Sequence, residues 1–577
     1  MLPFLLFLCL LVAVSLWLLY FKFYKPYLDC QVLLEDIQSA ADEKVERIGD
    51  TAIILGGSFA GLTSAIVLSK YYRRVIIVDR TVMEPLETVA KARQGEQAHA
   101  ISYRSLLVWD RLLPGFWSEL VEMTKANRLS QLMFPATEVK YFYREGYNLS
   151  GHFDLRSRSI ITASRGQMET ALRERIRKDL KNIEIFDGYN VSSNGINIER
   201  VQESNNGEKV VRVKSVTIAK CSQENDPADR LIIDCDLFVN CAGVGSNVLM
   251  KNIENEVSPH KKLLTKSKVE VKIRYQTVYF EPKDTSYDSE GKVVLCREDR
   301  QVNENRKIND PYYMIYHLLT YPNTKGMLIM PFTDNTMLLL LHNYNEKIES
   351  LTPERAKEQI LEFCKDFPDM EKDTSHVLDL LKDEPKRIAP IYEKNGSEYV
   401  HYENLKNVKG FIALGDAVAS LNPIYGQGIT LSVDSAVFLD SMIKKELETS
   451  NKAVFNAKFC NKFQLALSKT YLVPWILGSS SDLRFDFSKY SKNLYLQKLV
   501  APLLAWLTDR LFISSHYSAV SSYYFQTVLI MDDGFRKQLL NLRWLLGYVF
   551  WRELKMAMWC LAIAALCTLA VVGVENY

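Results

Sequence analysis

The sequence predicts an α/β protein in which a Rossmann-like nucleotide-binding domain is joined to a second domain built on a β-sheet. Three observations support this fold class: a glycine-rich strand–turn–helix–strand pattern near the N-terminus, a second glycine-rich segment far downstream, and a series of short strands between the two. An apolar run at each end of the chain adds two expected terminal membrane helices.

The first glycine-rich pattern lies between residues 51 and 79, TAIILGGSFAGLTSAIVLSKYYRRVIIVD. A β-branched strand, a tight turn, an apolar helix and a strand that ends in an acid together form a βαβ unit. The helix N-terminus offers free N–H groups to a pyrophosphate, and the carboxylate accepts hydrogen bonds from ribose hydroxyls. The alternative is an ordinary turn and strand end in an α/β core. The candidate ligand-binding residues are Gly56, Gly57, Ser58, Gly61 and Asp79.

The second pattern lies between residues 410 and 430, GFIALGDAVASLNPIYGQGIT. A short buried strand is closed by Gly415 and Asp416, and Gly426 and Gly428 open another helix. A carboxylate at a strand end beside a helix N-terminus suits a ligand with hydroxyl groups and a carbonyl that develops negative charge. The ribityl chain and the N1/O2 edge of a flavin have these two features.

At these residues the chain resembles the FAD-dependent monooxygenases of the p-hydroxybenzoate hydroxylase type, and within them the flavin-dependent epoxidases of the polyether and squalene epoxidase kind. In that family the pattern G-D-x-x-x-x-x-x-P-x-x-G-x-G binds the flavin, and Gly415, Asp416, Pro423, Gly426 and Gly428 fill it here. The resemblance implies FAD as the cofactor, with Asp416 on the ribityl side, Pro423 by the flavin face and the two glycines at the helix start near N1.

Further segments between about residues 50 and 490 are similar to the same family. Arg165, in SRGQMETALRERI, resembles the arginine that starts a helix and reaches the FAD, and an ordinary surface charge is the alternative. QGEQAH at residues 94–99 resembles the family's Q-G-x-H-A-H stretch. A Pro-Trp pair at 474–475, followed by Asp-Leu-Arg at 482–484, resembles the segment after the flavin helix.

The family pattern is broken in DLFVNCAGVGS, residues 236–246. Hydroxylases of this type often have an Asp-Gly pair there, which is implicated in FAD and nicotinamide contacts, whereas this chain has Ala242-Gly243. FAD binding is expected to survive the change. The electron donor is left open between NADPH or NADH acting directly and a separate reductase.

The motifs divide the chain into six expected parts. Short strands broken by polar turns predict a β-sheet wall: KVEVKIRYQTVYF at 268–280, GKVVLC at 291–296, YYMIYHLLTY at 312–321, GMLIMPF at 326–332 and TMLLLLHNY at 336–344. A threonine cap with proline in the first turn predicts a helix over 352–367. The parts are a transmembrane anchor at 2–21, an FAD-binding domain at 50–265 and 384–446, a β-sheet substrate domain at 266–383, a C-terminal helical region at 447–550, and a transmembrane or membrane-associated helix at 556–574.

The function expected from the resemblance is that of an FAD-dependent monooxygenase that hydroxylates or epoxidises a hydrophobic, lipid or isoprenoid-like substrate. In such enzymes the cofactor carries the chemistry, and the protein excludes water and places the substrate. No cluster of metal ligands or of residues for nucleophilic catalysis stands out. We assign no catalytic residue, and we give His99 no chemical role. The alternatives are an FAD-dependent reductase or dehydrogenase of a polyprenyl substrate, and a non-catalytic membrane scaffold.

The composition argues for a hydrophobic small molecule as the partner. The chain has 71 Lys and Arg against 69 Asp and Glu, so no global field draws it to nucleic acid. Ten cysteines occur without a C-x-x-C pair, which fits neither a zinc site nor a disulfide framework. Reduced and mostly buried thiols are expected.

The two apolar ends predict attachment to a membrane. Residues 2–21 are uncharged and long enough to cross the hydrocarbon layer, and no basic n-region marks a cleaved signal peptide. A buried or monotopic helix is the alternative for residues 556–574. The basic residues that flank the two runs all lie on the body side: Lys22, Lys25, Arg543, Arg552 and Lys555. The positive-inside rule therefore places the body in the cytosol, at the endoplasmic reticulum or another intracellular membrane.

We expect the sequons at Asn148, Asn190 and Asn395 to stay unused, because a cytosolic body never meets the glycosylation machinery of the lumen. Glycosidase treatment of the cell-expressed protein is expected to leave its gel mobility unchanged. A mobility shift that disappears when the three asparagines are replaced would place the body in the lumen and contradict this orientation.

Overall fold

The structure is a computed structural model. It describes residues 30, 32–40, 47–82, 97, 99, 101–124, 133–135, 139–144, 147–148, 159–161, 165–202, 209–222, 229–289, 293–303, 306–318, 321–332, 335–449, 455–490, 502, 506 and 509–510. The two apolar runs at 2–21 and 556–574 lie outside these residues. Within the described residues, no helix is long and apolar enough to span a bilayer.

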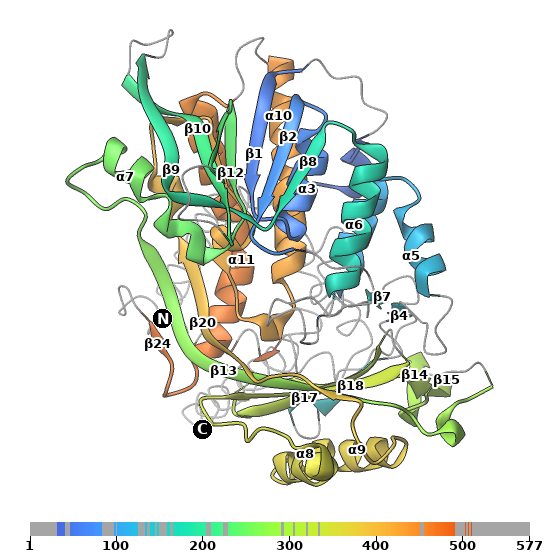
Figure 1. Ribbon diagram of the computed structural model, residues 1–577. Coiled ribbons are helices and arrows are strands. Elements are labelled where there is room, and N and C mark those ends of the chain that lie inside the picture. Colours follow the sequence, from blue (N-terminus) through green and yellow to red (C-terminus); the bar gives the residue numbers. More distant parts are fainter. Residues whose placement is uncertain are drawn as a thin grey trace, which may run out of the picture.

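A five-stranded parallel sheet is the framework of one half of the molecule (Figure 1). Its order is β22-β12-β1-β2-β8, and every pair is parallel. The strands are β1 (Gly49–Leu55), β2 (Tyr72–Asp79), β8 (Ile183–Asp187), β12 (Leu237–Asn240) and β22 (Phe411–Ala413). Both faces are covered, which explains the continuous apolar runs in β1 and β2. The predicted α/β fold with a parallel sheet is confirmed.

Helices pack along this sheet. Helix α3 (Phe59–Leu68) links β1 to β2, and all of its residues are buried between the sheet and neighbouring helices. Helix α10 (Gly428–Thr449) packs on α3, and α6 (Arg165–Asp179) packs beside them against β8. Helix α11 (Ala457–Asp482) packs on α10 and β22. Segments far apart in the sequence thereby form one helical layer.

Smaller elements surround this framework. Strands β9 (Tyr189–Gln202), β10 (Lys209–Lys220), β11 (Leu231–Asp234) and β21 (Val408–Lys409) form a four-stranded sheet on which α7 (Lys251–Val257) packs. Strands β3 (Ile101–Ser102), β4 (Met133–Pro135) and β7 (Ser159–Ile161) form a three-stranded sheet near α4 (Tyr103–Leu112) and α5 (Phe116–Thr124).

A ten-stranded sheet forms the other half (Figure 1). Its main path is β23-β20-β13-β18-β17-β16-β5-β6, and β19 and β24 also pair with β13. The strands are β5 (Val139–Arg144), β6 (Tyr147–Asn148), β13 (Lys266–Phe280), β16 (Met314–His317), β17 (Lys325–Phe332), β18 (Thr336–Tyr344), β19 (Arg387–Ile388), β20 (Tyr392–Val400), β23 (Ala419–Ser420) and β24 (Lys489–Tyr490). Four of them, β13, β16, β17 and β18, contain short strands expected from the sequence.

The two faces of this sheet have different neighbours. One face packs on α8 (Ala356–Cys364) and α9 (Pro368–Asp379) and forms a second apolar core with residues such as Leu339 and Leu341. The other face looks toward the parallel sheet (Figure 1). A hairpin of β14 (Cys296–Asn303) and β15 (Arg306–Tyr312) lies at one side.

In this half one local expectation is wrong and a second is confirmed only in part. In the described part of GKVVLC, Val293 makes only an isolated bridge to Tyr287, and β14 begins at Cys296. The helix expected over 352–367 starts as a 3-10 turn, and its α-helical part ends at Cys364. Thr352 makes no side-chain cap, and its backbone N–H donates to Gln359 Oε1 at 2.9 Å.

Strands of the expected FAD-binding domain, 50–265 and 384–446, occur in both of the large sheets. Strands β5 and β6 fall within 50–265 but pair in the ten-stranded sheet. Within 384–446, β19, β20 and β23 join that same sheet, whereas β22 joins the parallel one. The chain therefore passes repeatedly from one sheet to the other, and the space between them is enclosed by segments from many parts of the sequence.

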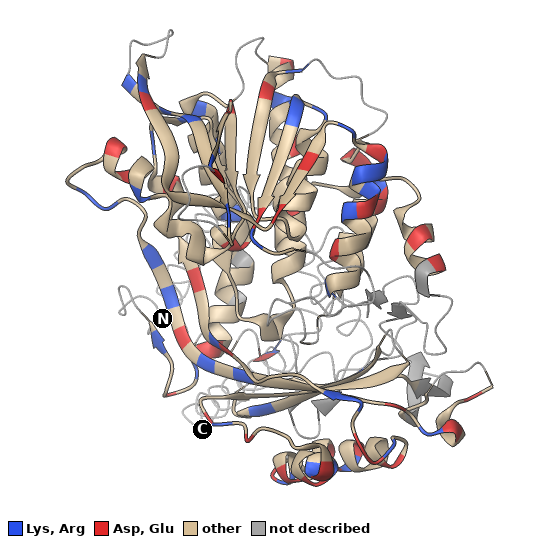
Figure 2. Ribbon diagram, in the orientation of Figure 1, with Lys and Arg blue, Asp and Glu red and all other residues tan. Residues whose placement is uncertain are grey.

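Charged residues of both signs are mixed over the described elements (Figure 2). Strand β13 carries basic residues whose partners lie on β20: Lys268 is 2.7 Å from Glu398, and Arg274 is 2.7 Å from Glu393. Helix α6 likewise carries both signs. This local pairing agrees with the near-neutral composition.

Candidate functional site

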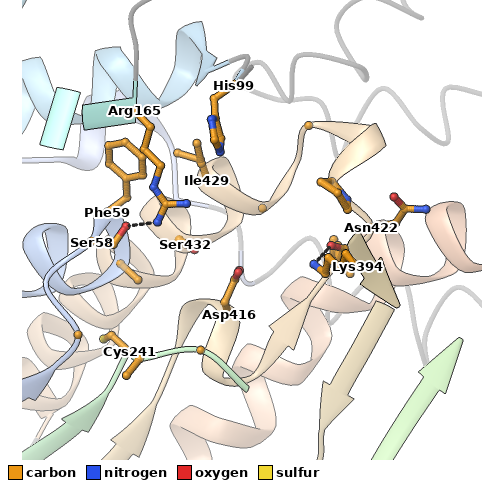
Figure 3. A pocket seen from close by; sticks show the side chains of 18 of the residues that line it. Ser58, Phe59, His99, Arg165, Cys241, Lys394, Asp416, Asn422, Ile429 and Ser432 are labelled. Carbon is orange, nitrogen blue, oxygen red and sulfur yellow. Dashed lines mark hydrogen bonds between the residues drawn. The ribbon is translucent and has the colours of Figure 1, made fainter. Parts of the chain in front are cut away.

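A cavity of about 780 Å³ lies between the C-terminal ends of the parallel strands and the ten-stranded sheet. Open parallel sheets bind ligands at this edge, where strands feed into helices. Residues from α3, α6, α10 and the β22–α10 segment surround it (Figure 3). The predicted site residues that line the cavity are Gly56, Gly57, Ser58, Asp79, Arg165, Asp416, Pro423, Gly426 and Gly428.

Two predicted residues, Gly61 and Gly415, lie beside the cavity and permit close packing. A Cβ added at Gly61 would lie 1.7 Å from the carbonyl oxygen of Gly56, so any side chain there would push α3 away from β1. Gly415 has a φ of +64°, and a Cβ there would lie 2.7 Å from that of Ala60. Both glycines therefore allow the close packing of α3 that supports the cavity wall.

Asp79, at the end of β2, is held by backbone amides of the first glycine-rich turn. Its Oδ2 accepts from the N–H of Gly57, and its Oδ1 accepts from the N–H of Thr81 at 2.7 Å. Behind the turn lies the buried Arg173 of α6, whose Nη2 donates to the carbonyl of Gly57 at 2.7 Å. Arg173 also pairs with Asp187 at the end of β8. Arg173 was not among the residues predicted from the sequence; it follows Arg165 by about two helical turns on α6.

Arg165 begins α6 and reaches the N-terminus of α3 (Figure 3). Its Nη2 donates to Ser58 Oγ at 2.9 Å, and its Nε donates to Glu169 Oε1 at 2.9 Å. The Ser58 hydroxyl also donates to Glu169, and the guanidinium lies 5.9 Å from the centre of the Phe59 ring. The arginine is therefore part of the cavity wall, which excludes the alternative of an ordinary surface charge.

The opposite wall is formed by Asp416 and the start of α10. Asp416 lies in the 3-10 turn that follows β22, and α10 begins at Gly428. A Cβ added at Gly426 would meet no described atom within 4 Å, and one at Gly428 would meet only Asp416 Oδ1, at 3.8 Å. The backbone of this segment faces open space, so a ligand can approach the helix N-terminus directly.

Lys394 of β20 lies next to Asp416 in the cavity wall (Figure 3). Its Nζ donates to Ser420 Oγ at 2.8 Å and to the carbonyl of Leu421 at 2.5 Å. Burial lowers the pKa of Lys394 from its ordinary value, while the carboxylate of Asp416 acts in the opposite direction. No local pattern around Lys394 signals this position, because only the pairing of β20 with β13 and β23 brings it to the cavity.

His99 also lines the cavity and is neutral at physiological pH. Its Nδ1 lies 2.9 Å from the carbonyl oxygen of Gln97. Burial and then the charge of Arg165 lower the pKa of His99 to about 3. A histidine in this state is a poor general acid near pH 7, which agrees with leaving it without a catalytic role.

The end of the cavity at the ten-stranded sheet is mostly apolar. Alternate residues of β13, β16, β17 and β18, with the residue after β16, point into it: Ile273, Tyr275, Met314, Tyr316, Leu318, Leu328, Leu340 and His342. The hydroxyl of Tyr316 donates to the carbonyl of Ile424 at 2.9 Å and so ties this wall to the segment before α10.

A buried carboxylate anchors that segment. Asp482, the last residue of α11, has no exposed surface, and its Oδ1 accepts from the hydroxyls of Tyr344 and Tyr425, each at 2.8 Å. The Nδ2 of Asn422 donates to the same carboxylate at 3.1 Å, and the Oδ1 of Asn422 accepts from the N–H of Ile424 at 3.2 Å. Burial raises the pKa of Asp482 to about 6, although its three donors act in the opposite direction.

No group of His, Cys, Asp and Glu in the described residues is arranged to hold a metal ion. Cys30, Cys235, Cys241, Cys364 and Cys460 are buried free thiols, and Cys221 is an exposed one, which agrees with the mostly buried thiols expected from the sequence. Cys241 lies in the cavity wall, and burial raises its pKa to about 12, so it is a neutral thiol there.

A parallel βαβ sheet with glycine-rich turns and a cavity at its strand ends has the architecture of the doubly wound nucleotide-binding class. No family model matches the chain. It is 22% identical over 445 residues to protein Rv3254 of Mycobacterium tuberculosis, which is 76% of this chain and 82% of that protein.

Two solved structures align with the chain at low identity. A flavoprotein/dehydrogenase from Cytophaga hutchinsonii aligns with a TM-score of 0.48 and 12% identity, over 85% of this chain and 96% of that one. PqsL of P. aeruginosa, in complex with 2-aminobenzoylacetate, aligns with a TM-score of 0.46 and 14% identity, over 75% of this chain and 94% of that one.

The Asp482 carboxylate is expected to make stability depend on pH. Its folded-state pKa of about 6 lies above the ordinary value of 3.8, so its contribution is complete below about pH 3.8 and is lost as the pH rises through 6. Between pH 4.5 and 7.5 the unfolding free energy of the wild type should fall by about 2 kcal/mol more than that of Asp482→Asn, which cannot titrate. Urea unfolding of the full chain at both pH values measures this, and parallel pH dependences would contradict it.

Proposed function

We propose that this protein binds FAD in the cavity and acts as an FAD-dependent monooxygenase, by hydroxylation or epoxidation, on a hydrophobic substrate of lipid or isoprenoid type. The observation that carries the proposal is that a single cavity joins two kinds of wall. At one side lie the two glycine-rich segments with Asp79 and Asp416, and at the other lies the apolar face of the ten-stranded sheet. A cofactor site thus opens directly onto a site for an apolar molecule.

The residues of the first side fit a dinucleotide. The turn at Gly57 and Ser58 presents a helix N-terminus to a pyrophosphate, and Asp79 lies at the strand end where a ribose is bound in this class of fold. Across the cavity, the open backbone at Gly426 and Gly428 supports close approach of a flat ring system to the start of α10. Asp416 lies beside that approach and can accept hydrogen bonds from hydroxyl groups.

FAD supplies the oxidation–reduction chemistry and the activation of dioxygen when it is bound. The chain contributes placement and exclusion of water. The apolar residues of β13, β16, β17 and β18 support a dry substrate site, and Arg165 and Lys394 place positive charge in the walls. We infer that NADPH or NADH provides the electrons, directly or through a separate reductase.

Membrane attachment is the second part of the proposal. The apolar runs at 2–21 and 556–574, with basic residues on their body sides, support an anchor in the endoplasmic reticulum or another intracellular membrane with the body in the cytosol. This arrangement gives a bilayer-dissolved substrate and a cytosolic electron donor access to the same protein.

Two substitutions are expected to weaken FAD retention. Asp416→Ala removes a charge-assisted hydrogen bond worth about 1.5 to 3 kcal/mol, which corresponds to roughly tenfold to hundredfold weaker binding. In Gly57→Val the added Cβ would lie 2.5 Å from Arg173 Nη2 and 2.9 Å from Asp79 Oδ2, so the phosphate-side turn is displaced. Flavin absorbance per protein and equilibrium dialysis with FAD measure both effects. The matched control is Asp383→Ala, whose side chain is 91% exposed, and the binding mode is wrong if all three variants bind FAD like the wild type.

Reduction of the FAD-loaded full chain without oxygen, followed by a rapid oxygen pulse, tests the reaction class. A monooxygenase is expected to give a transient absorbance band that differs from both oxidised and reduced flavin. Direct return to the oxidised spectrum, together with reduction of a polyprenyl substrate, would favour a reductase instead. Running the reduction step with NADPH alone and with NADH alone shows whether a separate reductase is needed.

A further inference from the structure

A histidine, His342, interrupts the mostly apolar sheet wall of the cavity, which also contains the tyrosines Tyr275 and Tyr316. His342 lies on β18, and its register partner on β13 is Tyr275. Directly paired residues point to the same face of a sheet, and both of these residues line the cavity. The imidazole therefore belongs to the face that looks toward the parallel sheet and the proposed FAD site.

The neighbouring strand leaves room for this imidazole. Gly326 of β17 is the register partner of His342 on that side. A Cβ added at Gly326 would lie 2.6 Å from Cε1 and 3.0 Å from Nε2 of the ring, so the ring occupies the space that a side chain would need. A half-turn about the Cβ–Cγ bond exchanges the two ring edges within nearly the same volume, so either edge can be presented to the cavity.

Among the residues that the structure describes, neither ring nitrogen of His342 has a hydrogen-bond partner, although the residue is only 2% exposed. The ring of Tyr316 is nearby, with the centroids 6.0 Å apart, but its hydroxyl donates to Ile424. Burial and then the nearby His317 lower the pKa of His342 to about 3, so its ring is uncharged near pH 7. Buried polar groups are almost always paired, so two nitrogens at a cavity wall with no partner among the described residues point to a bound ligand as the partner.

A second buried histidine of the same sheet gives the contrast. His317 Nε2 lies 3.2 Å from Asp373 Oδ2, and Lys140 Nζ lies 3.0 Å from the other oxygen of that carboxylate. This cluster of β16, β5 and α9 satisfies its histidine within the protein. His342 has no such arrangement in the described part of the chain, so the contacts seen there do not account for it.

We propose that His342 hydrogen-bonds a hydroxyl group of the substrate, and that the substrate is an apolar molecule with an uncharged hydroxyl, in preference to a plain hydrocarbon or a carboxylic acid. This inference rests on the proposed function, because it assigns the sheet wall to the substrate. A neutral imidazole has one donor nitrogen and one acceptor nitrogen, and a hydroxyl pairs with either. The described lining residues of β13, β16, β17 and β18 include no Lys or Arg. Lys394 of β20, the register partner of Ile273, also lines the cavity, but its Nζ already donates to Ser420 and Leu421, so a carboxylate beside His342 would lack a countercharge of its own.

Three probes with one carbon frame test the inference: 2-naphthol, naphthalene and 2-naphthoate. Their dissociation constants are measured by equilibrium dialysis on the full chain, with and without added FAD. In His342→Leu we expect the dissociation constant of 2-naphthol, divided by that of naphthalene, to rise about tenfold. This is the effect of one lost hydrogen bond to the hydroxyl group. His342→Gln, which keeps a donor and an acceptor, should recover part of this ratio. Leu340→Met, on the same face of β18, is the matched control and should leave the ratio unchanged.

Weaker binding of 2-naphthoate than of 2-naphthol by the wild type supports the uncharged substrate. An unchanged naphthol-to-naphthalene ratio in His342→Leu, or equal loss of both ligands, would overturn the inference. FAD retention of His342→Leu should equal that of the wild type. Failure of the wild type to bind FAD would refute the proposed function. That failure can be told apart from failure of the His342 inference, because the dialysis of the three probes is also run without FAD.

Discussion

The buried carboxylate of Asp482 connects the three parts of the chain on which the cavity depends. Tyr344 comes from β18 of the ten-stranded sheet, Asn422 and Tyr425 come from the segment before α10, and Asp482 itself ends α11. A buried carboxylate that loses a donor bears a large desolvation cost, so these contacts are strongly favoured together. The sheet wall and the helical layer are therefore held at a fixed separation.

The segment anchored in this way determines what the cavity presents to a ligand. Asn422 caps the turn that leads to Gly426, and beyond it the backbone at the start of α10 faces open space. On the other side, Lys394 donates to Ser420 and Leu421 of the same segment. The polar wall is thus built from backbone groups and a few buried charges, whereas the sheet supplies an apolar wall. An FAD monooxygenase needs this division, because its cofactor is polar and its substrate site must exclude water.

Several contacts likewise hold the first glycine-rich turn in place. Asp79 accepts hydrogen bonds from two backbone N–H groups. Arg173 donates to the carbonyl of Gly57 and also pairs with Asp187. The ends of β1, β2 and β8 are therefore linked through one turn. A rigid turn of this kind preorganises the helix N-terminus of α3 for an anion, which reduces the conformational cost of binding.

The sequence by itself determined the elements whose chemistry is local. The βαβ unit, the helix start at Gly428 and the strands β13, β16, β17 and β18 followed from periodicity and glycine positions, and most of the predicted site residues meet in one cavity. Only the tertiary structure decided which distant residues complete the site. Arg173, Lys394 and His342 carry no local signal of their roles, because each depends on partners from other elements. The Asp-Leu-Arg segment singled out Asp482, but not the partners that its carboxylate meets. Glycine turns and apolar periods act over a few residues, whereas the burial and pairing of a charged or polar side chain are set by the packing of the whole fold.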